Sequence, residues 1–289
     1  MDQGTVTVSG LQYYDIDQIF DCGQCFRFTR DSAGAWTGVA CRALLTLRQK
    51  DPQTLTICAE GAGGGMTQAA FETTFARFLG LQEDYGAIRS DIAARFPGDA
   101  TLQAAMAYGK GIRILKQEPW EALCSFIISQ NNNIPRIRKI IEAICARYGD
   151  PVGSRFAFPC PERLLSAGEQ ALRACGAGFR AGYLLDAAEK VASGEIDLEA
   201  LRTLSTEQAL ARLTAIKGVG PKVAYCTLLF GLEKFDAFPV DVWMKKMIDE
   251  QYGGKLAPES LGPYAGVAQQ YLFYYSRYKQ KREEAKKTG

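Results

Sequence analysis

Residues 213–226 read LTAIKGVGPKVAYC, and this stretch decides how the surrounding chain is organised. Upstream, Ser205 and Gln208 have the spacing of a capping box, which predicts a helix that opens at Thr206 and runs through TEQALARLTAI. After the KGVG turn, Pro221 suits the first position of a second helix because its missing N–H group is not needed there. The pattern therefore predicts a helix, a tight glycine turn and another helix.

The glycines of this turn admit two interpretations. Gly218 and Gly220 permit backbone angles that are forbidden to other residues, and they let another backbone approach closely. Free N–H groups at the start of the second helix carry partial positive charge, so Gly218, Gly220 and Val223 can form a phosphate-binding hairpin. The alternative is an ordinary turn between two helices, in which a glycine only caps the first helix. The turn alone does not decide between them.

A lysine and an aspartate stand at the starts of successive predicted helices. Lys222 lies in the first turn of its helix, where the dipole disfavours a cation and favours the neutral amine, a nucleophile that forms Schiff bases. Nineteen residues further on, FPVDVWM places Asp241 at the N-cap of the next helix. An idle surface lysine and an aspartate that only caps its helix are the alternatives.

The rest of the chain divides into strands followed by helices. Alternating, β-rich runs separated by turn residues predict strands within 5–10, 25–30, 37–49 and 53–60. From Thr67 onward the apolar periodicity is helical. We therefore predict an α+β protein: an antiparallel β-sheet domain with flanking helices over residues 1–108, then a larger, all-helical domain over 109–289. Because strands and helices do not alternate, a parallel dinucleotide-binding fold is disfavoured.

Composition excludes several classes of protein. The 289 residues carry a formal net charge of +2, so any nucleic-acid surface must come from local charge. No apolar run approaches the roughly 20 residues that span a membrane, and no secretory signal is visible, so we expect an intracellular protein, in the cytoplasm or nucleoid if bacterial. Histidine is absent, which rules out Ser–His and Cys–His nucleophile pairs and zinc sites that contain histidine.

The nine cysteines are scattered through apolar stretches, which suits reduced, buried thiols. Only Cys22 and Cys25 have the CxxC spacing of a redox motif. Such a motif usually opens a helix, whereas CFRFTR after it is typical of a strand, so the thiol-redox interpretation is disfavoured.

Together these elements resemble the helix–hairpin–helix, glycine/proline-rich-loop–aspartate DNA glycosylases, and within them the 8-oxoguanine DNA glycosylases. The resemblance spans nearly the whole chain. The motifs that carry it are CGQCFRF (22–28), SFIISQNNNIPRI (125–137), GAGFRAGYL (176–184), IKGVGPKVAYC (216–226), FPVDVWM (238–244) and GPYAGVAQQYLF (262–273).

The resemblance implies a bifunctional base-excision repair enzyme, a DNA N-glycosylase with AP lyase activity. Such an enzyme flips 8-oxoguanine out of the duplex and excises it. Lys222 would attack C1′ and form a Schiff base, Asp241 would stabilise the cationic sugar, and β-elimination would nick the strand. No four-cysteine cluster follows Cys226, so no iron–sulfur centre is expected. The expected partner is double-stranded DNA with 8-oxoguanine opposite cytosine, bound by a monomer without a membrane.

The family's base pocket maps onto four positions. Gly23 would offer its backbone carbonyl to the N7–H group that distinguishes 8-oxoguanine from guanine, and Gln269 would read the polar edge of the base. Phe273 and Cys226 would stack on its two faces. Without the resemblance, Gly23 reads as a turn residue, Gln269 as a helix surface residue, and the other two as core.

Four further residues would serve the opposite strand. Asn131 would enter the space left by the flipped base, and Arg136 and Arg180 would bond the orphaned cytosine. Phe179 would wedge beside it. Both arginines can instead belong to a solvated face, and Arg180 can contact phosphate.

The chain departs from the family at two positions. Trp243 stands where many relatives carry a phosphate-contacting histidine, and Ser276 stands where they carry its acidic partner. This change bears on phosphate contacts near the lesion and on the strictness of base-pair choice. The turn carbonyls of Thr214, Ile216 and Val219 would hold a structural monovalent cation; no other cofactor is expected.

Two alternatives of other classes stay open at this point. A non-catalytic DNA-binding protein would use the hairpin as a phosphate clamp, but phosphate binding requires neither Lys222 nor Asp241. A monofunctional alkylated-base glycosylase would also combine a β domain with this helical core, but such enzymes usually lack the lysine and use water.

Overall fold

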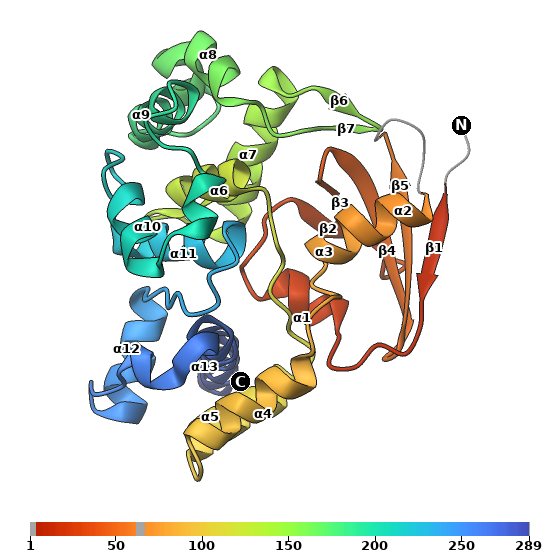
Figure 1. The fold of residues 1–289 in the computed structure, drawn as a ribbon, viewed down its shortest axis with the longest axis vertical. Coiled ribbons are helices and arrows are strands. Elements are labelled where there is room, and N and C mark those ends of the chain that lie inside the picture. Colours follow the sequence, from red (N-terminus) through yellow and green to blue (C-terminus); the bar gives the residue numbers. More distant parts are fainter. Residues whose placement is uncertain (1–3, 62–66, 289) are drawn as a thin grey trace.

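The computed structural model describes residues 4–61 and 67–288, with side chains of the last helix described as far as Tyr278. Its N-terminal part is the expected antiparallel sheet (Figure 1). The strands are β1 Thr5–Val8, β2 Phe28–Arg30, β3 Trp36–Ala40, β4 Ala43–Asp51 and β5 Thr54–Glu60. Their order is β1-β5-β4-β3-β2, and every neighbouring pair is antiparallel.

Two details of the predicted strands are wrong, and one short helix was not predicted. The stretch 37–49, expected as one strand, is divided into β3 and β4 by a turn in which Cys41 and Arg42 have φ of 51° and 55°. Two consecutive residues with positive φ make the hairpin turn that suits the twist of paired strands. The run 25–30 is strand only from Phe28. Helix α1 (Ile16–Asp21), which Asp15 caps, is too short to give a periodic pattern.

A helical segment over residues 68–78 covers one face of the sheet (Figure 1), and it contains α2 (Gln68–Ala70) and α3 (Ala76–Phe78). Alternate residues of β5 face the core, because side chains alternate along a strand. They pack in one apolar cluster with side chains of α1 and the 68–78 segment.

Helices form the larger, C-terminal part, as predicted. They are α4 Tyr85–Arg95, α5 Ala100–Tyr108, α6 Pro119–Ser129, α7 Ile134–Tyr148, α8 Pro161–Ala174, α9 Arg180–Ala192, α10 Thr206–Leu213, α11 Pro221–Gly231, α12 Val242–Tyr252 and α13 Ala265–Thr288. An unexpected hairpin, β6 (Pro151–Val152) with β7 (Arg155–Phe156), interrupts them. Val152 packs against Val39 and Leu44 of the sheet, so this hairpin joins the two parts.

The helical part has its own core, which includes the apolar side chains of α4 and α5. The domain boundary between residues 108 and 109 stays a prediction, although these two helices pack with the helices that follow them. Buried Arg113 ties both parts together by donating to the carbonyls of Gln12, Tyr13, Gly80 and Glu83. A buried cation with its donors satisfied fixes their relative position.

The last helix brings the end of the chain back to the N-terminal part. Helix α13 packs against α5 and α12. Its buried Gln270 donates from Nε2 to the carbonyl of Cys22 at 2.7 Å. This bond holds the loop that contains Gly23 beside α13.

Candidate active site

The hairpin between α10 and α11 has the predicted form. Ser205 and Gln208 make both bonds of the capping box. Gly218 has φ of 79°, and a Cβ atom there would lie 2.3 Å from the ring of Tyr183, so only glycine fits. Gly220 does not use the conformational freedom of glycine, because its φ of −88° is open to any residue, and its part in phosphate binding stays a prediction. Nothing lies within 4 Å of a Cβ added at Gly220, so this side of the turn is open.

The start of α11 offers free backbone donors. Pro221 occupies the first turn, and the first helical hydrogen bond runs from Ala224 N to the Gly220 carbonyl at 3.0 Å. The N–H groups of Lys222 and Val223 precede this bond, so the helix itself does not use them. Together with the open side at Gly220, this is the geometry of a phosphate site.

Helix α9 supports the hairpin from behind. The carboxylate of Asp186 accepts a hydrogen bond from the backbone N–H of Lys217 at 2.8 Å. The Tyr183 ring, one turn earlier, packs against Gly218. Helix α9 therefore anchors the hairpin by a hydrogen bond to its backbone and by packing against Gly218.

Lys222 and Asp241 line the same cavity, but they are not paired with each other. The Nζ atom of Lys222 donates to Ser129 Oγ at 3.0 Å and lies 5.3 Å from the centre of the Phe126 ring. Asp241 caps α12, as predicted, through Oδ1, which accepts from the N–H groups of Trp243 and Met244.

The predicted base-contacting residues meet in one small pocket of about 50 Å³. They come from three separate segments: the loop after α1, helix α11 and helix α13. The pocket is lined by Gly23, Lys222, Cys226, Asp241, Gln269 and Phe273, with Phe126, Phe230, Pro239 and Gln270. Sequence reasoning missed these last four, because neither the three apolar residues nor Gln270 carries a local sign of which cavity it faces.

Gln269 presents an unusual group to this pocket. The residue is 4% exposed, and its Oε1 atom has no hydrogen-bond partner among the residues that the structure describes. A buried acceptor without a partner is costly, so it calls for a donor from outside the protein.

Cys226 is also buried, and burial raises the pKa of its thiol to about 11, although nearby Lys222 acts in the opposite direction. Its thiol is therefore neutral near pH 7.

A larger cavity of about 680 Å³ adjoins this pocket and shares Lys222 and Asp241 with it. Asn131, Phe179 and Trp243 also line the larger cavity. Asn131 has φ of 45°, a conformation that asparagine tolerates better than most residues. Phe179 is 47% exposed, which is unusual for so large an apolar side chain.

The two predicted cytosine-binding arginines are placed differently. Arg136 is exposed in the first turn of α7 and does not line either cavity. Arg180 is only 2% exposed. Its guanidinium donates to the carbonyls of Gln130 and Asn131, so it holds the loop that carries Asn131.

The remaining predictions concern Trp243 and Ser276, the CxxC cysteines and the membrane. Ser276 does not line either cavity, whereas Trp243 lines the larger one. Burial raises the pKa of Cys22 to about 11 and that of Cys25 to about 12, which contradicts the thiol-redox alternative. No helix in the described part of the chain is long and apolar enough to cross a membrane.

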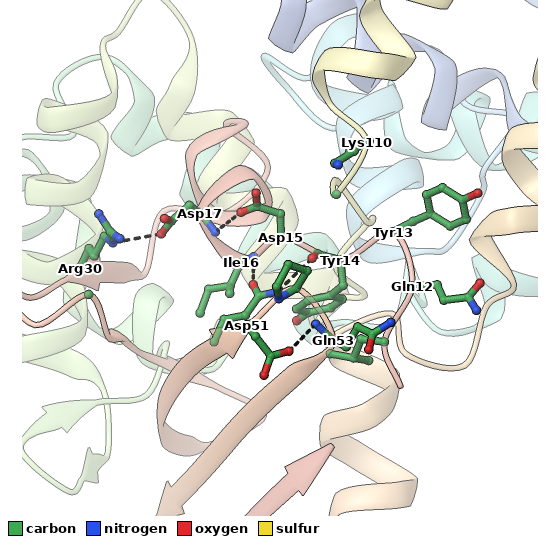
Figure 2. A pocket seen from close by; sticks show the side chains of 15 residues that line it. Gln12, Tyr13, Tyr14, Asp15, Ile16, Asp17, Arg30, Asp51, Gln53 and Lys110 are labelled. Carbon is green, nitrogen blue, oxygen red and sulfur yellow. Dashed lines mark hydrogen bonds and ion pairs between the residues drawn. The ribbon is translucent and has the colours of Figure 1, made fainter. Parts of the chain in front are cut away.

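Another cavity, of about 650 Å³, lies beside α1 and shares no residue with those around Lys222 (Figure 2). Two of its carboxylates bond other groups in its wall. Asp17 accepts from Arg30 at 3.0 Å, and Asp51 accepts from the Gln53 N–H at 2.8 Å. This cavity is therefore separate from the candidate active site.

Two family comparisons cover most of the chain. Residues 8–123 match the family described as 8-oxoguanine DNA glycosylase, N-terminal domain. Residues 124–259 match the HhH-GPD superfamily of base excision DNA repair proteins. The fold and the hairpin with its lysine and aspartate thus define a helix–hairpin–helix DNA glycosylase.

Individual relatives narrow this class. The N-glycosylase/DNA lyase OGG1 of Arabidopsis thaliana is 31% identical over 279 residues, which cover 88% of this chain and 75% of the relative. MBOgg1, solved with a low-affinity DNA ligand, matches with a TM-score of 0.88 and 36% identity over 97% of this chain and 98% of its own. The chain belongs to the 8-oxoguanine DNA glycosylase family.

A further solved structure contains DNA. The Clostridium acetobutylicum 8-oxoguanine glycosylase/lyase, in complex with double-stranded DNA that has cytosine opposite 8-oxoguanine, has a TM-score of 0.88 and 34% identity. The match covers 97% of this chain and 100% of that one. By contrast, the 3-methyladenine DNA glycosylase of Archaeoglobus fulgidus, at 21% identity and a TM-score of 0.72, shares the fold alone.

Proposed function

We propose that this protein excises 8-oxoguanine from duplex DNA and then nicks the strand, with Lys222 as the nucleophile. The observation that carries this proposal is the single pocket in which Lys222 and Asp241 meet a buried, unpartnered glutamine oxygen. A DNA substrate would put the activity in the compartment that contains the genome, which is the cytoplasm or nucleoid if the protein is bacterial.

The proposed reaction begins at the sugar. The C1′–N9 bond breaks with its electron pair on the departing base, and the lone pair of Lys222 Nζ forms a new bond to C1′. One proton passes from the attached nitrogen to the departing base. The C1′–O4′ bond then breaks, O4′ takes up a proton, and the nitrogen lone pair forms the C=N bond of the protonated Schiff base. Loss of a C2′ proton then expels the 3′-phosphate, which nicks the strand by β-elimination.

Asp241 acts on the charge that develops in this step. Its carboxylate is fixed because Oδ1 accepts two backbone hydrogen bonds, and Oδ2 accepts none from the described residues. A carboxylate held in a cavity stabilises the cationic sugar of the transition state without having to reorganise.

Gln269 supports the choice of a guanine-type base. The Watson–Crick edge of guanine carries two donors, N1–H and the N2 amino group, and either would satisfy the unpartnered Oε1. Gly23 would add the contact to N7–H, which guanine itself lacks. 8-Oxoguanine has a donor at N7 for the Gly23 carbonyl and guanine has none, and a difference of this kind discriminates strongly between two bases.

The residues around the larger cavity would serve the opposite strand. Exposed Phe179 would act as a wedge, and Asn131 would enter the duplex beside it. Arg180 would support the Asn131 loop while the one N–H group that its bonds to Gln130, Asn131 and Ala177 leave free reaches cytosine, and Arg136 would approach from α7. The hydrogen bonds that Arg180 makes to the loop support its place at this edge of the cavity.

The hairpin would hold a monovalent cation through the carbonyls of Thr214, Ile216 and Val219. Carbonyl oxygens suit hard cations. Ile216 already accepts from the Val219 N–H at 3.0 Å and has a second lone pair to offer. Replacing potassium with a bulky organic cation at constant ionic strength should then weaken DNA binding.

Cleavage of duplexes with 8-oxoguanine opposite each of the four bases tests the proposal. Borohydride should trap a covalent protein–DNA adduct, and Lys222→Gln should abolish it. Lys217→Gln is the matched control, because it removes the same charge from the same hairpin but from an exposed position. An adduct that persists in Lys222→Gln would refute the assignment.

The alkylated-base alternative makes a different prediction. An enzyme of that kind would release 3-methyladenine without forming an adduct, and hot alkali would be needed to break the strand. Adduct formation with 8-oxoguanine duplexes and no release of 3-methyladenine would exclude it.

A further inference from the structure

Ser129, at the end of α6, makes the only hydrogen bond to the Lys222 amine among the described residues. It lines the larger cavity, so it lies beside the space that the sugar would occupy. Sequence motifs do not single it out, because a serine at the end of a helix is common.

The Ser129 hydroxyl has a defined direction. Its Oγ donates to the carbonyl of Phe126 at 2.8 Å, three residues earlier in α6. A hydroxyl has one hydrogen to give, so toward Lys222 it acts only as an acceptor. It therefore does not donate to the lone pair of a neutral amine, and that lone pair stays free to attack.

Neighbouring groups complete the seat of the amine. The Phe126 ring lies 5.3 Å from Nζ and is itself held by stacking on Phe230, with ring centres 5.4 Å apart. No ion pair joins Lys222 to Asp241 among the described residues, since the hydrogen bonds of Asp241 go to the start of α12. The lysine is thus held by α6 and not by its proposed charge partner.

We propose that Ser129 is a positioning residue: it holds the Lys222 amine by one N–H group and keeps the nitrogen lone pair directed away from any donor. This inference rests on the proposed role of Lys222 as nucleophile. A lysine side chain is flexible, and one fixed acceptor removes much of that freedom before the substrate arrives.

Three variants at this position separate the effect of the hydroxyl from the effect of side-chain size. Ser129→Ala removes the acceptor, Ser129→Cys keeps nearly the same size with a poor acceptor, and Ser129→Thr keeps the hydroxyl. Ser193→Ala is the matched control. Its Oγ also donates three residues back, to Lys190 at 3.3 Å at the end of α9, but it does not contact Lys222.

The measurement is the single-turnover rate of borohydride trapping on two duplexes, one with 8-oxoguanine opposite cytosine and one with a preformed abasic site. Ser129→Ala and Ser129→Cys should be slower by on the order of tenfold on both duplexes. Ser129→Thr and Ser193→Ala should stay near the wild-type rate. DNA affinity and melting temperature should not change, so the loss falls on the chemical step.

Several results would overturn the proposal. These are a wild-type rate in Ser129→Ala, or Ser129→Thr as slow as Ser129→Ala while both remain folded. A loss of DNA affinity in step with the rate would also overturn it. If the wild-type protein forms no adduct with either duplex, the proposed function itself fails. If the wild-type protein forms the adduct and the Ser129 variants form it at the same rate, the proposed function stands but Ser129 has no part in it.

Discussion

Replacement of Gly218 by alanine tests how the hairpin is built. The new Cβ would lie 2.3 Å from the Tyr183 ring, and φ of 79° is strained for any residue with a side chain. The left-handed conformation costs about 1–2 kcal/mol. Overpacking against a fixed ring adds about 1–3 kcal/mol. We therefore expect Gly218→Ala to lower the free energy of unfolding by about 2–5 kcal/mol and the melting temperature by on the order of 10 °C.

Gly194→Ala separates the two contributions. Gly194 has nearly the same φ, 78°, but no atom lies within 4 Å of an added Cβ. It should therefore show only the backbone strain of about 1–2 kcal/mol. Urea and thermal unfolding, followed by circular dichroism, measure both variants under the same conditions. The excess loss in Gly218→Ala is then the effect of the clash with Tyr183.

A double variant and a binding assay complete the test. Tyr183→Ala should relieve part of the loss in Gly218→Ala, because the two residues are in contact and their effects are not additive. Fluorescence anisotropy with a duplex should show weaker binding by Gly218→Ala, since the hairpin must move to admit the methyl group. Equal unfolding free energies for Gly218→Ala and Gly194→Ala would refute the packing argument.

Three further predictions concern the site. Asp241→Asn keeps an acceptor for the helix cap, so its melting temperature should stay close to wild type while single-turnover excision falls by about 100-fold or more; equal loss of stability and activity would contradict this. With a pKa of about 11, Cys226 is about one-thousandth thiolate at pH 8, and this fraction rises with pH. Because Cys226 is buried and Cys160 is exposed, iodoacetamide should modify Cys160 first, as mass spectrometry would show. Arg180→Ala should lower the melting temperature because it leaves two loop carbonyls without donors, whereas Arg136→Ala should not; calorimetry would compare them.

The parts of the structure that the sequence predicts well rest on local chemistry. The capping box at Ser205, Pro221 at the start of α11, and Asp241 at the cap of α12 each depend on atoms a few residues apart. Such hydrogen bonds form in the same way in any fold, so their residue types suffice to predict them.

The parts that the sequence did not predict either lack a local signal or depend on distant residues. The turn at Cys41 and Arg42 has no glycine or asparagine to announce it, although both residues have positive φ. Arg180 is buried because the loop before α7 supplies carbonyls for it, which no local pattern reveals. Gly220 shows the opposite error, since its sequence context suggests a strained backbone that the chain does not adopt.

The base pocket is a third case, because its residues were predicted but not from their local sequence. Gly23 and Gln269 are far apart in sequence, and only the resemblance to a family placed them together. The structure shows why they meet: Gln270, next to Gln269, donates a hydrogen bond to the carbonyl of Cys22, next to Gly23.

Helix α9 contacts both the Asn131 loop and the hairpin, so it fixes their positions relative to each other. Its first residue grips the Asn131 loop, and its next two turns hold the hairpin through Tyr183 and Asp186. If the hairpin binds a phosphate and Asn131 enters the duplex, as proposed, the distance between these two contacts is set by α9. The nucleic acid would then take up the deformation, and a base pair already weakened by damage yields at lower cost than an intact one.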